Sequence, residues 1–138
     1  TLTPQFVSTF SKRFGEQIAV FHSALSLGER LDEYKRVKKG LAKIVIGTRS
    51  AVFAPFEKVG LIIMDEEQEY SYKSESSPRY HAREIAKFRC SYDNALLVLS
   101  SATPSVESYY TQKTEDIRLT RSLRDTAMRF CRRLLSQT

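Results

Sequence analysis

The segment Val59–Gln68, VGLIIMDEEQ, is a nearly unbroken apolar run that ends in three consecutive carboxylates. An apolar run of this length between turn residues is typical of a strand that is buried on both faces of a parallel sheet. Ligands of open α/β sheets bind just outside the carboxyl ends of such strands. The segment therefore predicts paired acids at a metal–phosphate site. On these residues alone, a buried strand followed by a solvated acidic turn fits equally well.

The composition is that of one ordinary soluble globular domain. The chain has 138 residues, of which 41% are hydrophobic and 28% charged, and this is enough for a sizeable core. No apolar run approaches the roughly 20 residues that a membrane-spanning helix needs, so we expect no membrane partner. The first residues, TLTPQ, resemble neither a signal peptide nor an initiator start, and we expect the sequence to begin inside a longer protein.

The chain carries a net charge of +6, from 22 Lys and Arg residues against 16 Asp and Glu residues. Such an excess favours a polyanionic partner without identifying one. Much of it lies near the C-terminal end, in Arg118, Arg121, Arg124, Arg129, Arg132 and Arg133. A charge run of this kind is also typical of the solvated face of a helix.

Segments of helical and strand character alternate along the chain. Thr3 and Pro4 open a first helix that Gly15 ends, and Ser26 with Glu29 forms the capping box of a second helix. The expected strands are residues 18–21, 43–48, 59–64 and 95–99. The expected helices are residues 4–14, 26–39 and 82–92, one from residue 103, and an Arg-rich last helix. Residues 71–78 are expected to form a loop.

This alternation predicts an α/β fold, with a three-layer, mostly parallel sheet that carries helices on both faces. In the helix over residues 82–92, we expect Ile85, Ala86 and Phe88 to be buried. The cysteines, Cys90 and Cys131, form no CxxC pair, so we interpret both as reduced core residues and expect no zinc site.

Four short polar segments lie at the expected ends of strands or starts of helices: LTPQ at residues 2–5, GTRSA at 47–51, DEEQ at 65–68 and SAT at 101–103. Strand ends of a parallel sheet share one edge, so we expect these segments to converge. An acidic pair at such an edge is the arrangement of a Walker B, or DExH-type, nucleotide-hydrolysis motif.

In this order and spacing, the four segments resemble motifs Ia, Ib, II and III of superfamily 2 helicases. Longer runs resemble more closely the primosomal protein N′ family of replication-restart helicases. These runs are DEEQEYSYK at residues 65–73, PRYHAR at 78–83, RSAVFAPF at 49–56 and SATPSVESY at 101–109. The resemblance covers roughly residues 1–112, and motifs of this length are specific.

The resemblance implies an incomplete RecA-like helicase ATP-binding lobe over residues 1–120, followed by an Arg-rich helix over 121–138 that departs from the family pattern. It implies a fragment of an ATP-dependent 3′-to-5′ DNA helicase that restarts replication at stalled forks. The implied cofactors are ATP and Mg²⁺, with zinc held elsewhere in the full-length family. The implied partners are forked or single-stranded DNA, primosome proteins and single-stranded-DNA-binding protein, in a bacterial cytoplasm.

The resemblance also assigns roles to the acidic motif. Asp65 would hold Mg²⁺, a hard ion that prefers oxygen ligands and keeps much of its water. Glu66 would orient or deprotonate the attacking water, and Glu67 would support the loop. Gln68 stands where the family usually has His; an amide can still bridge to a hydroxyl, but it takes up no proton. Coupling of hydrolysis to movement is assigned to Ser101, Ala102 and Thr103.

DNA contacts are assigned to two groups of residues. Helix-start N–H groups, hydroxyls and Arg suit phosphate oxygens without reading sequence, and aromatics interleaved with cations suit unpaired bases. The first group is Thr3, Pro4, Gln5, Thr48, Arg49 and Ser50; the second is Tyr72, Lys73, Arg79, Tyr80, His81 and Arg83. Helix capping and turn formation are the alternative interpretation of the first group.

No Gly-x-x-x-x-Gly-Lys-Ser/Thr pattern occurs in the 138 residues, and the family places this phosphate-binding loop ahead of motif Ia. We therefore expect the fragment alone to be inactive. Two alternatives remain open: a non-catalytic nucleic-acid-binding module derived from a helicase lobe, and a phospho-acceptor signalling domain with its Asp at a strand end. The second would need an acidic pair near its first strand and a Lys after a late strand, where this chain has SAT.

Overall fold

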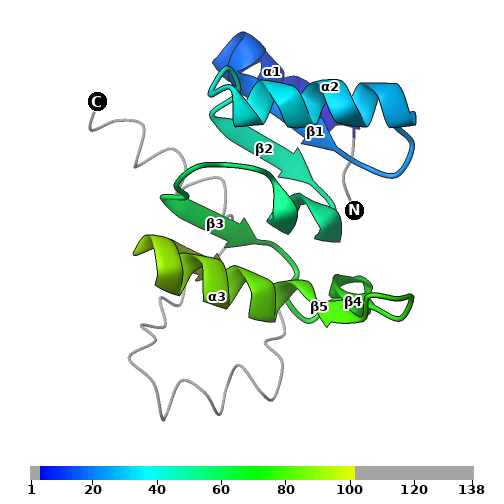
Figure 1. The fold of residues 1–138 in the computed structure, drawn as a ribbon, viewed down its shortest axis with the longest axis vertical. Coiled ribbons are helices and arrows are strands. Elements are labelled where there is room, and N and C mark those ends of the chain that lie inside the picture. The colour runs from blue at the N-terminus through cyan, green and yellow to red at the C-terminus, as the bar shows by residue number, and fades with distance from the viewer. Residues whose placement is uncertain (1–3, 102–138) are drawn as a thin grey trace.

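A computed structural model describes residues 4–101, which alternate between helix and strand (Figure 1). The longer helices are α1 (Pro4–Phe14), α2 (Leu27–Lys38) and α3 (Ala82–Asp93). The main strands are β1 (Ile18–Phe21), β2 (Ile44–Gly47), β3 (Leu61–Met64) and β6 (Leu96–Leu99), and a short hairpin is formed by β4 (Lys73–Ser74) and β5 (Tyr80–His81). Single 3₁₀ turns are η1 (Gly15–Gln17), η2 (Arg49–Phe53) and η3 (Tyr70–Tyr72).

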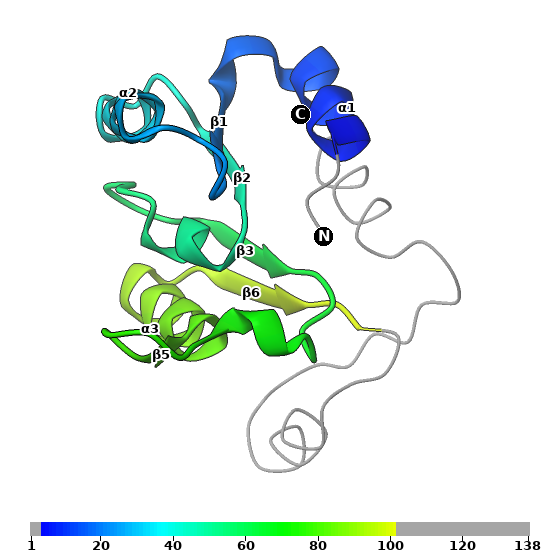
Figure 2. The same ribbon diagram turned by 90° about the vertical axis from the view of Figure 1, so that its right-hand side faces the viewer.

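The described strands form three two-stranded sheets. Strand β1 pairs with β2 in parallel, β3 pairs with β6 in parallel, and β4 pairs with β5 antiparallel. Helices α2 and α3 lie on one side of the strands and α1 on the other (Figure 2). The expected α/β alternation and parallel pairing are confirmed. The sheets of the described residues are small and separate, and the expected three-layer arrangement is not clearly seen in them.

Each of the two parallel pairs has its own connecting helix. Helix α2 connects β1 to β2, and α3 connects the hairpin to β6. Each pair also has its own core: Ala19, Val37 and Ala42 in the first, and Met64 and Ala86 in the second. Between them the chain leaves β2 through η2 and reaches β3 without hydrogen-bonding the two strands to each other.

Local sequence signals set the helix ends. The Ser26 Oγ accepts from the Glu29 N–H at 3.3 Å, and the Glu29 carboxylate accepts from the Ser26 N–H at 2.8 Å, so the predicted capping box is present. The Ser26 hydroxyl also donates to the Glu29 carboxylate at 2.7 Å, and this bond, together with the one from the Ser26 N–H, lowers the pKa of the Glu29 carboxyl. Gly15 and Gly40 follow helices with φ of 57° and 71°, a conformation in which glycine meets no side-chain penalty.

Helix α3 corrects one burial prediction and supports another. Ala86 is buried as expected and Ile85 is half-buried, but Phe88 is 71% exposed. The buried stripe consists of Ala82, Ala86 and Cys90, at spacings of four residues, and this places Phe88 on the opposite side of the helix. Burial raises the pKa of the Cys90 thiol, as fits a core cysteine. Cys131 lies outside the described residues.

Between residues 4 and 101, none of the helices has the length and apolar character to cross a membrane. The interpretation of residues 121–138 as an Arg-rich helix falls outside the described part, as does the helix expected from residue 103.

Gly47 of β2 is paired with Phe21 of β1, and its surroundings give a first prediction. A Cβ at Gly47 would lie 2.4 Å from the Phe21 carbonyl oxygen and 2.8 Å from the Ala51 Cβ. We expect Gly47→Ala to lower the free energy of unfolding by about 2 kcal/mol, through overpacking.

Gly28 in α2 provides the matched control, because a Cβ at this position would have no other heavy atom within 4 Å. Gly28→Ala should therefore raise the free energy of unfolding by about 0.5–1 kcal/mol. Urea unfolding followed by circular dichroism measures both; equal stability of Gly47→Ala and wild type would contradict the β1–β2 packing.

Candidate functional site

The acidic residues stand at the carboxyl end of β3. Asp65 and Glu66 are exposed, whereas Glu67 is 3% exposed. The pairing with β6 continues past the strands, since the Ser100 N–H donates to the Met64 carbonyl at 2.8 Å and the Glu67 N–H donates to the Ser100 carbonyl at 3.0 Å. The predicted location of the two exposed carboxylates at a strand end is therefore observed.

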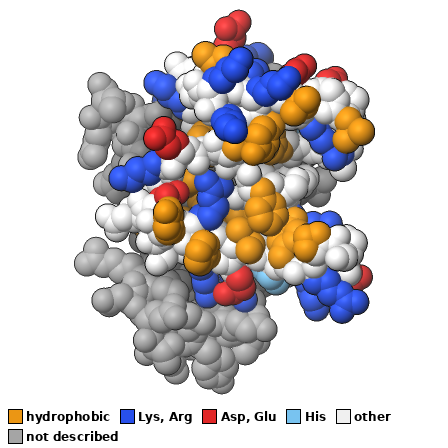
Figure 3. Space-filling model, viewed as in Figure 1, with side chains coloured by type: hydrophobic (Ala, Val, Ile, Leu, Met, Phe, Trp, Pro, Cys, Tyr) orange, Lys and Arg blue, Asp and Glu red, His pale blue; other side chains and the backbone are white. Residues whose placement is uncertain are grey.

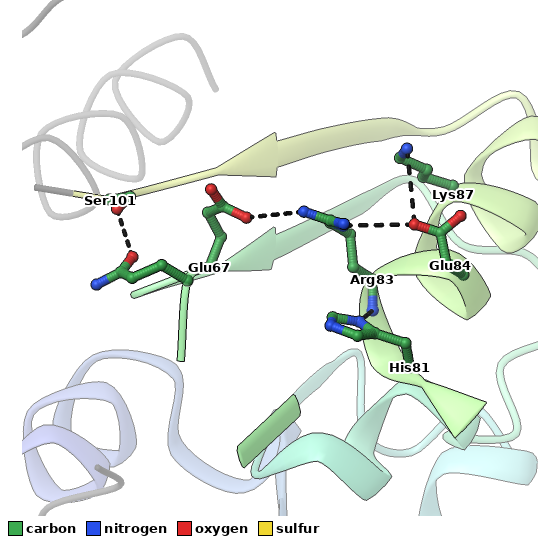
Figure 4. Close-up of polar contacts among 7 residues, drawn as sticks. Glu67, His81, Arg83, Glu84, Lys87 and Ser101 are labelled. Carbon is green, nitrogen blue, oxygen red and sulfur yellow. Dashed lines mark hydrogen bonds and ion pairs between the residues drawn. The ribbon is translucent and has the colours of Figure 1, made fainter. Parts of the chain in front are cut away.

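Residues 65–68 form what we call the acidic turn. A short chain of hydrogen bonds connects it to the end of β6. The Gln68 Nε2 donates to the Glu66 carboxylate, and the Ser101 Oγ donates to the Gln68 Oε1. Figure 4 shows Ser101 at the end of the strand, directed at the side chain that accepts this bond. Both ends of the Gln68 amide are thereby used, one as donor and one as acceptor. Ala102 and Thr103 lie outside the described residues.

Glu67 is tied to the start of α3. The Arg83 Nη1 lies 3.2 Å from the Glu67 carboxylate, and the two side chains are 13% and 2% exposed. Figure 4 shows the guanidinium of Arg83 between Glu67 and Glu84, with Lys87 beyond Glu84. The resemblance assigned Arg83 to DNA contact, and the structure places its guanidinium against a buried carboxylate. Sequence reasoning gave Glu67 a supporting role, and this contact fits that role.

The exposed carboxylates suit a hard cation. Among residues 4–101, no group of three or more His, Cys, Asp or Glu side chains is arranged to hold a metal ion. Mg²⁺ does not need such a group, because it keeps several waters and takes one or two carboxylates together with substrate phosphates. Asp65 and Glu66 are adjacent, exposed and formally anionic, and so the chemistry of this donor set fits Mg²⁺ bound with a nucleotide.

The segment that follows the acidic turn folds back on it. The Tyr72 Oη donates to the Asp65 carbonyl at 2.7 Å. Burial raises the pKa of the Tyr72 phenol, and the carboxylates of Asp65, Glu69 and Glu66 raise it further, so the phenol keeps the proton that it donates. The rings of Tyr72 and Tyr80 also pack against the second core, and Tyr80 meets Phe53 edge-on at 4.9 Å between ring centroids. Both tyrosines are therefore partly core residues.

The β4–β5 hairpin presents cations beside a shallow hollow. The hollow has a volume of about 560 Å³ and is lined by Lys73, Ser74, Glu75, Arg79, Tyr80 and His81. Basic side chains gather at this end of the molecule (Figure 3). Lys73 lies over the Tyr70 ring, 5.6 Å from its centroid, and Tyr70 is 64% exposed. His81 caps α3, since its Nδ1 accepts from the Arg83 N–H at 3.2 Å.

The other residues assigned to DNA differ in exposure. Pro4, Gln5, Thr48 and Ser50 are exposed, and Thr3 lies outside the described part. Arg49 is half-buried, and its Nη1 donates to the carbonyls of Ser71 and Lys73. This contact was not predicted, because a guanidinium that binds carbonyls more than twenty residues away leaves no local sequence pattern.

Sequence reasoning also missed Arg89. Its Nη1 donates to the carbonyls of Val52 and Ala54, both at 2.8 Å, and this fixes η2 to α3. No signal in the neighbouring residues identifies these acceptors.

Comparison with known proteins adds independent evidence. Residues 1–111 match the profile of the family described as DEAD/DEAH box helicase. The chain is 53% identical over 109 residues to the replication restart protein PriA of Bacillus subtilis, covering 79% of this chain and 14% of that protein. It is 52% identical over 109 residues to the PriA of Treponema pallidum (79% and 17%), and 49% identical over 111 residues to that of Synechocystis (80% and 13%). The resemblance to replication-restart helicases is confirmed, and the chain spans 13–17% of these relatives' length.

The contact between Arg83 and Glu67 gives a second prediction. Arg83→Met removes the guanidinium that faces the buried Glu67 carboxylate, and we expect the free energy of unfolding to fall by about 3 kcal/mol. Adding Glu67→Gln removes the buried charge as well and should recover part of this loss.

Lys87→Met is the matched control, since Lys87 pairs at 3.7 Å with the exposed Glu84. Its effect on the free energy of unfolding should stay within about 0.5 kcal/mol. Urea titration measures all three variants, and an Arg83→Met variant as stable as Lys87→Met contradicts a structural role for the pair.

Proposed function

The chain belongs to the DEAD/DEAH box helicase family, and we propose that it forms part of the first motor lobe of an ATP-dependent 3′-to-5′ DNA helicase that acts in replication restart. The observation that carries the proposal is the exposed carboxylate pair at the end of β3, joined through Gln68 to Ser101 at the end of β6. Such an edge is where nucleotide phosphates bind in α/β sheets.

In this proposal the acidic residues act on the γ-phosphate. Asp65 would hold Mg²⁺, and the ion, when bound, would neutralise charge on the phosphates. Glu66 orients the attacking water and accepts its proton. The Gln68 amide fixes the orientation of the Glu66 carboxylate and links it to Ser101, and we assign coupling between hydrolysis and movement to Ser101, Ala102 and Thr103. Because an amide takes up no proton, Gln68 orients the Glu66 carboxylate but does not relay a proton.

The DNA-contact residues are proposed to bind the sugar–phosphate backbone without reading sequence. The exposed side chains of Gln5, Thr48 and Ser50 supply polar contacts, together with Thr3 and Pro4 at the first helix. Lys73 and Arg79 supply charge at the hairpin, where Tyr80 and His81 line the same hollow. In the longer protein we propose forked or single-stranded DNA, primosome proteins and single-stranded-DNA-binding protein as partners, in a bacterial cytoplasm.

A second candidate is a nucleic-acid-binding module of the same fold that does not hydrolyse ATP. It is left open by Gln68, whose amide takes up no proton, and no Gly-x-x-x-x-Gly-Lys-Ser/Thr pattern occurs in these 138 residues. A chain without this phosphate-binding loop lacks the backbone N–H groups that cradle the β- and γ-phosphates, and for this reason we expect the 138-residue chain by itself to be inactive under either candidate.

The role of Glu66 gives a third prediction, tested in the full-length protein. Glu66→Gln keeps the shape of the side chain and removes the base, so the DNA-stimulated ATPase kcat should fall by about 10²–10⁴-fold while forked DNA still binds. Glu69→Gln is the control: Glu69 is exposed on the same turn and has no role in the chemistry, so its kcat should match wild type.

Steady-state ATPase assays with and without forked DNA separate the two candidates. An unchanged rate in Glu66→Gln removes Glu66 from its role. A wild-type full-length protein that binds DNA and shows no DNA-stimulated turnover supports the binding module instead. Turnover by the 138-residue chain alone contradicts the inactivity expected of it.

A further inference from the structure

The three consecutive carboxylates of the acidic turn do not share one environment. Asp65 and Glu66 are exposed, whereas Glu67 is buried. The Arg83 Nη1 lies 3.2 Å from the Glu67 carboxylate, and the two side chains are 13% and 2% exposed. Figure 4 shows them directed at each other, one from the strand end and one from the start of α3. A carboxylate buried this deeply needs a cation beside it, and this contact therefore fixes the side chain of Glu67.

The main chain of Glu67 is fixed as well, from the neighbouring strand. Its N–H donates to the Ser100 carbonyl at 3.0 Å, just beyond the last residue of β6. Glu66, the residue immediately before it, has a φ of 51°, a left-handed conformation that costs free energy in a residue with a side chain. Because Glu67 is held at its side chain and at its main chain, a relaxed backbone at Glu66 would move Glu67 away from one of these contacts.

The backbone conformation at Glu66 also determines where its carboxylate lies, because a change of φ turns the Cα–Cβ bond relative to the preceding strand. In the observed conformation the side chain is exposed and accepts a hydrogen bond from the Gln68 Nε2. A general base works only within hydrogen-bond reach of the proton that it takes. A misplacement of about 1 Å can cost about 10²-fold in rate, so the hold on Glu67 has a consequence for the chemistry assigned to Glu66.

We propose that Arg83 and Glu67 are positioning residues for hydrolysis: their buried ion pair holds Glu66 in the left-handed conformation that sets the place of its carboxylate. This deepens the proposed function and rests on it. It differs from the assignment of Arg83 to DNA, because here the guanidinium acts through Glu67. It also goes beyond a stabilising role, because it predicts a loss of turnover in protein that is still folded.

Stability and positioning respond differently to removal of the pair. Arg83→Met leaves the Glu67 carboxylate buried without a cation, so both stability and positioning are lost. Adding Glu67→Gln removes the buried charge and recovers part of the stability, but it does not bring back the contact that holds the turn. The contact from Arg83 is made by one nitrogen, which the single ammonium of lysine can replace, so Arg83→Lys keeps the pair.

The test uses the full-length protein with Arg83→Met, Arg83→Lys and the double variant that combines Arg83→Met with Glu67→Gln. The DNA-stimulated ATPase is measured at a temperature at which urea unfolding shows every variant to be folded. We expect Arg83→Met to lose about 10–10²-fold in kcat, with the KM for ATP and the binding of a single-stranded oligonucleotide unchanged, because Glu66 acts on the attacking water. The double variant should regain stability but not kcat, and Arg83→Lys should keep most of its kcat.

Val37→Ala is the matched control for lost stability. Val37 is 2% exposed and belongs to the first core, which does not include the acidic turn. Truncation of this buried side chain should lower the free energy of unfolding and leave kcat as in wild type. Amide hydrogen exchange gives a readout that does not depend on ATP: the Glu67 N–H should exchange faster in Arg83→Met, and at the wild-type rate in Arg83→Lys.

Three results would overturn the inference. The first is an Arg83→Met variant that is less stable but keeps its kcat, because the pair then only stabilises the fold. The second is an Arg83→Met variant that binds the oligonucleotide more weakly and keeps its kcat at saturating DNA, as a DNA contact would. The third is a double variant that regains kcat together with stability. If the wild-type protein shows no DNA-stimulated ATPase, the proposed function fails, and the exchange rate of the Glu67 N–H in the same variants still decides whether the pair holds the turn.

Discussion

The parallel pairing of β3 with β6 is the interaction on which the candidate site depends. Its register joins Met64 to Leu99, and the hydrogen bonds from Ser100 to Met64 and from Glu67 to Ser100 extend it beyond both strands. Two segments more than thirty residues apart therefore end at the same level. The contact between Gln68 and Ser101 follows from this register, and a slip of one residue would turn the side chains to opposite faces and separate them.

The sequence was most informative where the signals are local. The capping box of α2, the glycine ends of α1 and α2 and the four apolar strands depend on neighbouring residues, and the structure has them within one or two residues of the expected bounds. The division into separate strand pairs could not be predicted, because it depends on the path from β2 to β3. The exposure of Phe88 was also missed because it depends on tertiary packing. Helical spacing predicts that one stripe of the helix is buried, but the packing of small Ala82 and Ala86 against Met64 decides which stripe it is.

The candidate site shows the same limit. The strand-end rule placed Asp65 and Glu66 correctly at an exposed edge, because the rule needs only an apolar strand followed by acids. It could not distinguish Arg83 or Arg49 from an exposed cation. Arg83 faces a buried carboxylate, and Arg49 and Arg89 bind backbone carbonyls. The net charge of +6 counts such arginines, although their side chains are only partly exposed.

The conformation of Glu66 shows what holds the acidic turn in place. Among the described residues, the non-glycine residues with positive φ are Asn94 and Glu66, at 55° and 51°. Asn94 is the C-cap of α3, a position where Asn tolerates this conformation. Glu66 has no such local reason, and a strained conformation of this kind persists only where the surroundings impose it. Here they do: the next residue must bury its carboxylate beside Arg83 while its N–H reaches Ser100. The chain meets both demands by a sharp turn at Glu66, and that turn leaves the Glu66 carboxylate exposed, where Gln68 can orient it.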